Sequence, residues 1–111
     1  MARYTHLTIY QKAYDLTLRL FRETHEFPRD YKYSLGQQMK DASLALLDAI
    51  IEANGVPDKK SALEAANARL ERLRVYIRLA YDLKVIGMSK YEVLSKHSDE
   101  IGRMIGGWMK S

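Results

Sequence analysis

Residues 58–86 read DKKSALEAANARLERLRVYIRLAYDLKVI, and this stretch decides the fold. Apolar residues recur along it at alternating spacings of three and four, without a break, at Leu63, Ala66, Leu70, Leu73, Ile77 and Ala80. This spacing places a continuous apolar seam on one side of an α-helix. Asp58 is a typical N-cap residue and Gly87 a typical stop, so the pattern predicts a helix from about Asp58 to Ile86.

Three more helices are predicted around this one, because few glycines and prolines interrupt the chain. Their expected bounds are about Thr8 to His25, about Asp30 or Ser34 to Asn54, and about Ser89 to Trp108. Each begins with the spacing of a capping box, at Thr8/Gln11, Ser34/Gln37 and Ser89/Glu92. The connections are short, which favours antiparallel neighbours. The sequence therefore predicts one domain, residues 1–111, folded as an all-α, up-down-up-down four-helix bundle.

The third predicted helix has a second apolar line beside its seam. The residues expected at an interface are Tyr76, Leu79, Leu83 and Ile86 on this line, and Trp108 on the last helix. One four-helix bundle cannot bury so many apolar helix faces, and apolar patches that stay exposed to solvent mark interfaces. We therefore expect a homo-oligomer; the alternative is a central helix buried on every side. Gly102 and Gly106, four residues apart, predict close packing of the last helix against a neighbour.

Composition excludes several classes of protein. The chain has no cysteine, which excludes disulfides and thiolate zinc sites and fits a reducing cytoplasm. No apolar run approaches the roughly 20 residues of a membrane helix. The segment Met1–His6 lacks the basic-then-apolar pattern of a signal peptide. We expect a cytoplasmic protein without a membrane partner.

Residues typical of catalysis are scattered along the chain. His6, His25 and His97 lie in different segments, without the Glu-x-x-His pairs of di-iron bundles. Asp48 and Glu52 share a helix face, where a solvated surface is commoner than an acid–base pair. No phosphate-cradling glycine loop follows a strand pattern. We expect no enzymatic activity, no metal and no cofactor.

The residues that do point to a function are basic. The chain has 18 Lys and Arg against 14 Asp and Glu, a formal net charge of +4. Arg74 and Arg78 stand one turn apart, with Tyr81 further along, and such residues suit phosphates and unpaired bases. The candidate nucleic-acid or polymerase contacts are Arg74, Arg78, Arg69, Arg72, Lys12 and Arg103. The alternative is a solvated face on which Glu71 pairs with Arg74 and Asp82 with Arg78.

Several stretches resemble known proteins. They are YQKA at 10–13, FP at 27–28, Gln38, Ala42, EA at 52–53, LRVYIRL at 73–79 and EIGRMIGGW at 100–108. The layout from Leu7 to Ile86 is similar to the small four-helix bundle proteins encoded in intervening sequences of bacterial 23S rRNA genes. The stretches at 73–79 and 100–108 resemble a narrower relative, the accessory variability protein of diversity-generating retroelements.

The second resemblance implies a function that composition alone does not give. Such proteins form a homopentameric basic barrel, bind RNA and DNA, and dock the element's reverse transcriptase during mutagenic copying of a template RNA. They are not enzymes, and the family's two third-helix arginines fall on Arg74 and Arg78. The broader rRNA-linked branch implies instead a structural or protein-interaction bundle without a direct nucleic-acid role.

Overall fold

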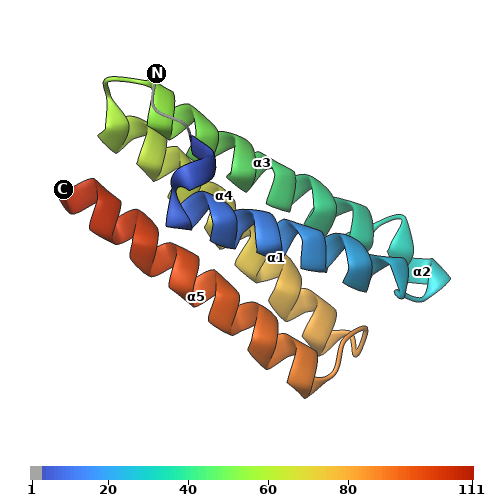
Figure 1. Cartoon of the computed structure of the whole chain (residues 1–111). Coiled ribbons are helices and arrows are strands. Elements are labelled where there is room, and N and C mark those ends of the chain that lie inside the picture. The colour runs from blue at the N-terminus through green and yellow to red at the C-terminus, as the bar shows by residue number, and fades with distance from the viewer. Residues whose placement is uncertain (1–3) are drawn as a thin grey trace.

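The computed structural model describes residues 4–111 as an all-helical chain (Figure 1). Most of it lies in four long helices, α1 (Thr8–His25), α3 (Leu35–Gly55), α4 (Lys59–Asp82) and α5 (Met88–Lys110). Two short elements complete it, the 3-10 helix η1 (Tyr4–His6) and the single turn α2 (Arg29–Lys32). The described residues form no strand.

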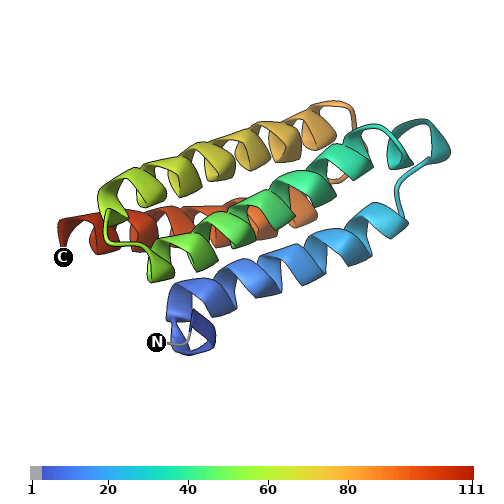
Figure 2. The ribbon, with the colours of Figure 1, turned by 90° about the horizontal axis from the view of Figure 1, so that it is seen from above.

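The long helices run antiparallel to their neighbours along the chain (Figures 1 and 2). Helix α3 packs between α1 and α4, and α5 closes the bundle by packing against α4 and α1. The result is an elongated body of 43 × 21 × 20 Å. This is the up-down-up-down arrangement that the sequence predicts for one chain, and assembly into an oligomer stays a prediction.

The α4 seam lies at the centre of the core. All of its residues are at most 1% exposed, from Leu63 to Ala80. They pack among fully buried side chains of the other helices, namely Leu16, Leu20, Met39, Leu46, Ile50, Leu94, Ile101 and Ile105. Burying each large aliphatic side chain contributes roughly 1.5–3 kcal/mol, so the periodic seams dominate the stability of the fold.

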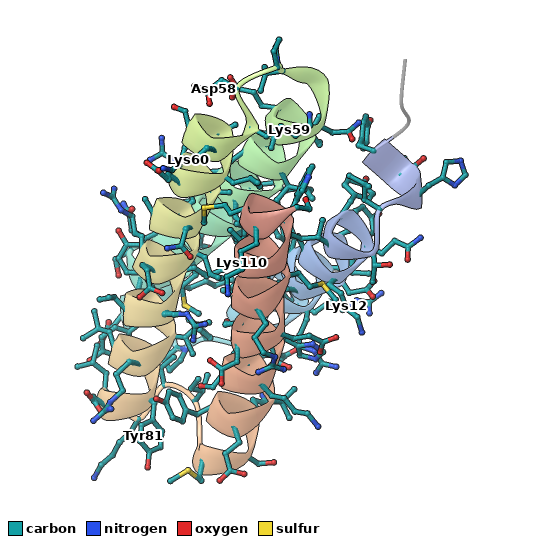
Figure 3. The ribbon with its side chains drawn as sticks, turned by 90° about the vertical axis from the view of Figure 1, so that its left-hand side faces the viewer. Lys12, Asp58, Lys59, Lys60, Tyr81 and Lys110 are labelled. Carbon is teal, nitrogen blue, oxygen red and sulfur yellow. The ribbon has the colours of Figure 1, made fainter. Side chains whose placement is uncertain are left out.

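The connection between α3 and α4 is closed by two adjacent polar residues, both labelled in Figure 3. The Asp58 carboxylate accepts a hydrogen bond from the Ser61 backbone N–H at 3.2 Å, which confirms the predicted N-cap. The Lys59 ammonium donates to the carbonyl oxygens of Ala53 at 2.9 Å and Val56 at 3.0 Å. Lys59 therefore satisfies carbonyls that the end of α3 leaves open.

The predicted capping boxes are wrong. Helix α1 begins after Leu7 and α5 after Gly87, so Thr8 and Ser89 are already inside their helices. Ser34 does precede α3, but its side chain makes no cap hydrogen bond. Capping-box spacing is short, and the backbone path before each helix decides which residue becomes the N-cap.

Of the two predicted starts of the second helix, Ser34 is confirmed, because Ser34 is the N-cap of α3. Residues 29–32 form the separate turn α2. Gly36 packs closely against the chain at this turn. A Cβ atom at Gly36 would lie 3.3 Å from the Tyr31 carbonyl oxygen and 3.4 Å from the ring of Phe27, which is buried. The turn folds back onto the end of α1, and a larger residue at this position would require its neighbours to shift by a few tenths of an ångström.

Helix α4 ends at Asp82, four residues earlier than predicted. Lys84 has a φ of 62°, in the left-handed region, and the Val85 N–H donates to the Ala80 carbonyl oxygen at 2.8 Å. These are the features of a Schellman motif, which terminates a helix. The chain then turns inward, and Ile86 is only 4% exposed.

Lys84→Gly is expected to raise the free energy of unfolding by about 1 kcal/mol. A left-handed residue with a Cβ atom is strained by roughly 1–2 kcal/mol, and glycine removes that strain at some cost in unfolded-state entropy. Urea denaturation followed by circular dichroism measures the change. Lys60→Gly, in the first turn of α4, is the control and is expected to destabilise. A loss of stability in Lys84→Gly would contradict the left-handed geometry.

None of the described helices combines the length and sustained hydropathy that crossing a bilayer requires. The expectation about a signal peptide concerns Met1–His6 and falls partly on residues 1–3, outside the described residues. Nothing in the remaining residues of that segment, the 3-10 turn Tyr4–His6, is buried.

Candidate nucleic-acid interface

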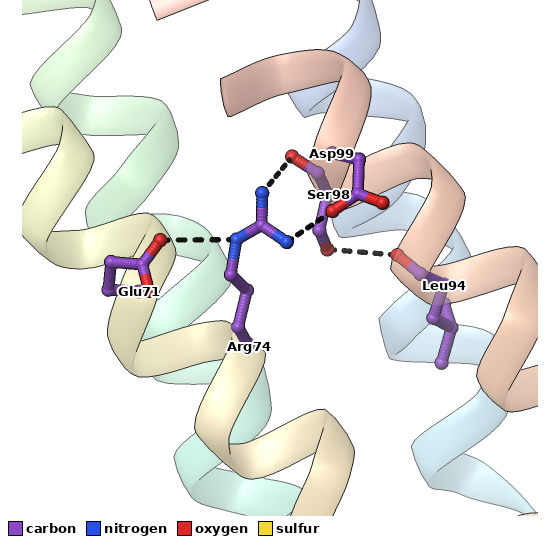
Figure 4. Close-up of polar contacts among 5 residues, drawn as sticks. All are labelled: Glu71, Arg74, Leu94, Ser98 and Asp99. Carbon is purple, nitrogen blue, oxygen red and sulfur yellow. Dashed lines mark hydrogen bonds and ion pairs between the residues drawn. The ribbon is translucent and has the colours of Figure 1, made fainter. Parts of the chain in front are cut away.

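Arg74 joins α4 to α5 rather than facing solvent (Figure 4). Its Nη1 atom is bonded to the Asp99 carboxylate, and its Nη2 atom donates to the Ser98 carbonyl oxygen at 3.2 Å. Its Nε atom, which is buried, lies 3.2 Å from Glu71 Oε1 as an ion pair without hydrogen-bond geometry. Two carboxylates and a carbonyl thus surround the guanidinium group, and the two negative charges offset its attraction for a phosphate.

The close approach of Arg74 to α5 depends on Gly102. A Cβ atom at Gly102 would lie 3.0 Å from Arg74 Nη2 and 3.4 Å from Leu70 Cδ2. The predicted close packing at Gly102 is therefore present. At Gly106 it is absent, because a Cβ atom there meets nothing within 4 Å. The two glycines share a spacing but not a role.

Arg78 makes a local ion pair. Its Nε atom lies 3.0 and 3.1 Å from the two carboxylate oxygens of Asp82, one turn further along α4. The hydrogen bond and charge of Asp82 raise the pKa of Arg78 above its ordinary value. The pairings Glu71–Arg74 and Arg78–Asp82, raised as the alternative to a phosphate-binding stripe, are both present.

Tyr81 already has an aromatic partner. Its ring stacks on Tyr91 of α5, with centroids 4.5 Å apart and planes 19° apart. Figure 3 places Tyr81 at the opposite end of the bundle from Asp58. One face of the ring is covered by Tyr91, so base stacking at this position has only the other face to use.

Lys12 and α5 meet at the seam between the first and last helices. The Lys12 ammonium lies 2.9 Å from Glu100 Oε1, and Lys90 lies 2.9 Å from Glu23 Oε2. The hydrogen bond from Lys12 lowers the pKa of the Glu100 carboxyl group. Lys12 is thus a cross-seam contact rather than a free cation.

The remaining candidates Arg69, Arg72 and Arg103 are exposed. Within residues 4–111 none of them makes an ion pair. Arg69 and Arg72 lie on the side of α4 that faces α3, where they line a hollow with Gln38 and Tyr76. Arg103 lies beside Gly102 in a shallow depression between α4 and α5. The cations free to meet an anionic partner are therefore not the pair that the sequence singled out.

The predicted interface residues fall into two groups. Leu79 on α4 is 43% exposed and the C-cap residue of that helix, Leu83, is 41% exposed, while Tyr76 and Trp108 are half-buried. Ile86 belongs to the core of its own chain, because the turn at Lys84 carries it inward, and it is not part of any outer face. Val75, 62% exposed, lies one turn before Leu79 and extends this exposed apolar surface.

No metal site is formed in the part of the chain that the structure describes, since no three His, Asp or Glu side chains gather there.

Sequence reasoning missed two contacts of the candidate site, Asp99 and the Ser98 carbonyl on α5. Both lie far from Arg74 along the chain, at separations of 25 and 24 residues. Helical periodicity carries no signal for such pairs.

Arg74→Ala is expected to lower the free energy of unfolding by about 1–2 kcal/mol, because it removes charge-assisted bonds between two helices. Arg78→Ala is expected to lower stability less, since its main partner Asp82 is exposed and on the same helix, and only the contact with Tyr91 reaches α5. Urea denaturation of both variants measures the difference. Equal effects would contradict the interhelical role of Arg74.

Comparison with known families identifies a related family. The model of a family described as bAvd-like matches residues 7–111, which is nearly the whole chain. A search of curated proteins finds no match. The matched range contains all four long helices and every candidate contact residue, from Lys12 to Arg103.

Proposed function

The chain belongs to the bAvd-like family, and we propose that it is a non-enzymatic accessory protein of a diversity-generating retroelement. The observation that carries this proposal is the match over residues 7–111, which includes the closing stretch EIGRMIGGW. In this role the protein holds the element's reverse transcriptase and its template RNA together in the cytoplasm during mutagenic copying.

The proposed assembly is a homopentamer. Support comes from Val75 and Leu79 on α4 and from Leu83 directly after it, which are all more than 40% exposed. Apolar residues grouped in this way mark protein–protein interfaces. We place Trp108 at the edge of the same contacts. Ile86, which is buried, and Tyr76, which lines the surface between α3 and α4, are left out.

The proposed affinity for RNA and DNA rests on charge. Each chain has a net charge of +4, and a ring repeats its free cations once per subunit. Arg69, Arg72 and Arg103 are exposed and have no ion pair within the described residues. A field built in this way attracts phosphates and weakens with added salt.

The test is reconstitution with the reverse transcriptase encoded beside this gene. We expect the tagged protein to retain the polymerase on a column, and cDNA synthesis from the template-repeat RNA to depend on the protein. A polymerase that neither binds it nor needs it would refute the proposal. Binding of a different protein, together with no affinity for RNA at low salt, would support the alternative of a protein-interaction bundle.

A further inference from the structure

The surface between α3 and α4 contains a hollow of about 180 Å³, called here the α3–α4 hollow. Two small side chains, Ala42 and Ala45, line part of its α3 side one turn apart. Arg69 and Arg72 line it from α4. Because alanine side chains are short, the surface sinks between the two helices at this point. The hollow is smaller than the roughly 300–1,000 Å³ of drug-sized ligand sites and suits one small planar group.

The two arginines of the α3–α4 hollow are free. Arg69 and Arg72 are exposed and stand one turn apart on α4. Neither pairs with a carboxylate in the part of the chain that the structure describes. Asp41 also lines the hollow, but its Oδ1 atom accepts a hydrogen bond at 3.0 Å from Gln37, a residue on its own helix. The guanidinium groups therefore remain available for an anion.

The rest of the lining suits a nucleobase. Tyr76, half-buried and one turn beyond Arg72, also lines the hollow, and Gln38 lines it from α3. Aromatic rings stack on bases of any sequence, and an amide can both donate to and accept from a base edge. Paired guanidinium groups bind backbone phosphates. In a duplex the bases are stacked inside the helix, so only an unpaired base can enter such a site.

We infer that the α3–α4 hollow binds one unpaired nucleotide of a single-stranded nucleic acid. Arg69 and Arg72 contact the flanking phosphates, and the base lies against Tyr76 with Gln38 at its edge. The inference rests on the proposed function, because it names the class of nucleic acid that the accessory protein holds. It applies to RNA and DNA alike, since none of these contacts requires a 2′-hydroxyl.

The test is fluorescence anisotropy with three labelled probes, a uridine RNA decamer, a thymidine DNA decamer and a hairpin duplex. Tyr76→Leu keeps an apolar side chain but removes the stacking ring. It is expected to weaken binding of both decamers about tenfold, with little change for the duplex. Arg69→Ala with Arg72→Ala is expected to weaken decamer binding by more than tenfold. Unequal losses for the two decamers would show which strand the site prefers.

A matched control separates local contact from overall charge. Arg19 and Arg22 are also one turn apart and exposed, but they lie on α1. The double change Arg19→Ala and Arg22→Ala removes the same charge and is expected to weaken decamer binding less than threefold. Each variant must keep its helicity and native mass. If Tyr76→Leu loses helicity or native mass, the test rests on decamer binding by the Arg69 and Arg72 double variant, compared with the Arg19 and Arg22 control.

Three outcomes would overturn the inference. One is equal losses for the hollow and control variants. Another is unchanged decamer binding by a Tyr76→Leu variant that is folded. The third is a hollow variant that no longer binds the polymerase but binds the decamers as wild type does, which would assign the hollow to a protein partner. Wild-type protein that binds none of the probes would refute nucleic-acid binding in the proposed function itself. Wild-type binding that ignores the hollow variants would refute only the inference.

Discussion

Replacing Leu79 and Leu83 together with serine is expected to turn the proposed assembly into single 12.9 kDa chains that stay helical. Leu79 on α4 and Leu83, its C-cap residue, are both more than 40% exposed, so the fold of one chain does not depend on their side chains. Burying a leucine at an interface contributes up to roughly 1.5–3 kcal/mol, and each interface of a ring loses this contribution twice. Native mass at micromolar concentration measures the result.

The control for this change keeps the apolar surface. Leu79→Met with Leu83→Met is expected to preserve the assembly, because methionine retains most of the volume and hydropathy of leucine. Serine variants that assemble as wild type does would contradict the role of this face. Wild-type protein that runs as a single 12.9 kDa particle would contradict the assembly itself.

Gly102→Leu and Gly106→Leu are expected to change stability in opposite directions. Leucine at Gly102 must displace the Arg74 guanidinium group and press on Leu70, which is fully buried. We expect a loss of about 2–3 kcal/mol in the free energy of unfolding. Leucine at Gly106 meets no atom near its Cβ, and it should add up to about 0.8 kcal/mol through helix propensity.

Urea denaturation of the two glycine variants measures this difference under identical conditions. Dilute protein keeps the measurement on the single chain, away from any assembly. Losses of similar size at both positions would contradict the claim that only Gly102 is closely packed. A Gly102→Leu variant with unchanged stability would show that Arg74 can leave α5 at little cost. The residue type, the helix and the replacement are the same in both variants, so only the local surroundings differ.

Periodicity carries the part of the fold that the sequence predicts well. The seam from Leu63 to Ala80 becomes the most buried line of the molecule, because one buried face leaves a clear spacing signal. The helix ends are less predictable. Lys84 adopts a conformation usually reserved for glycine, and Gly36 is explained only by the nearby Tyr31 carbonyl. Both depend on contacts that the chain makes after it has folded.

The candidate site follows the same division. The pairs Glu71–Arg74 and Arg78–Asp82 are visible in the sequence, because partners three or four residues apart share a helix face. The bond from Arg74 to Asp99 joins two helices and has no local signature. The α3–α4 hollow depends on how α3 and α4 pack. The sequence could therefore name Arg69 and Arg72 as candidates, but it could not show that neither of them pairs with a carboxylate.

The Lys12–Glu100 contact joins two helices that no loop connects directly. The contact between α1 and α5 can therefore open without any loop being stretched. In such a local opening α1 moves away from α5, while α3, α4 and α5 stay joined to one another by their loops. Amide hydrogens of α1 are then expected to exchange with heavy water earlier than those of α4. Added electrolyte, which screens the Lys12 ammonium from its carboxylate, should hasten that exchange.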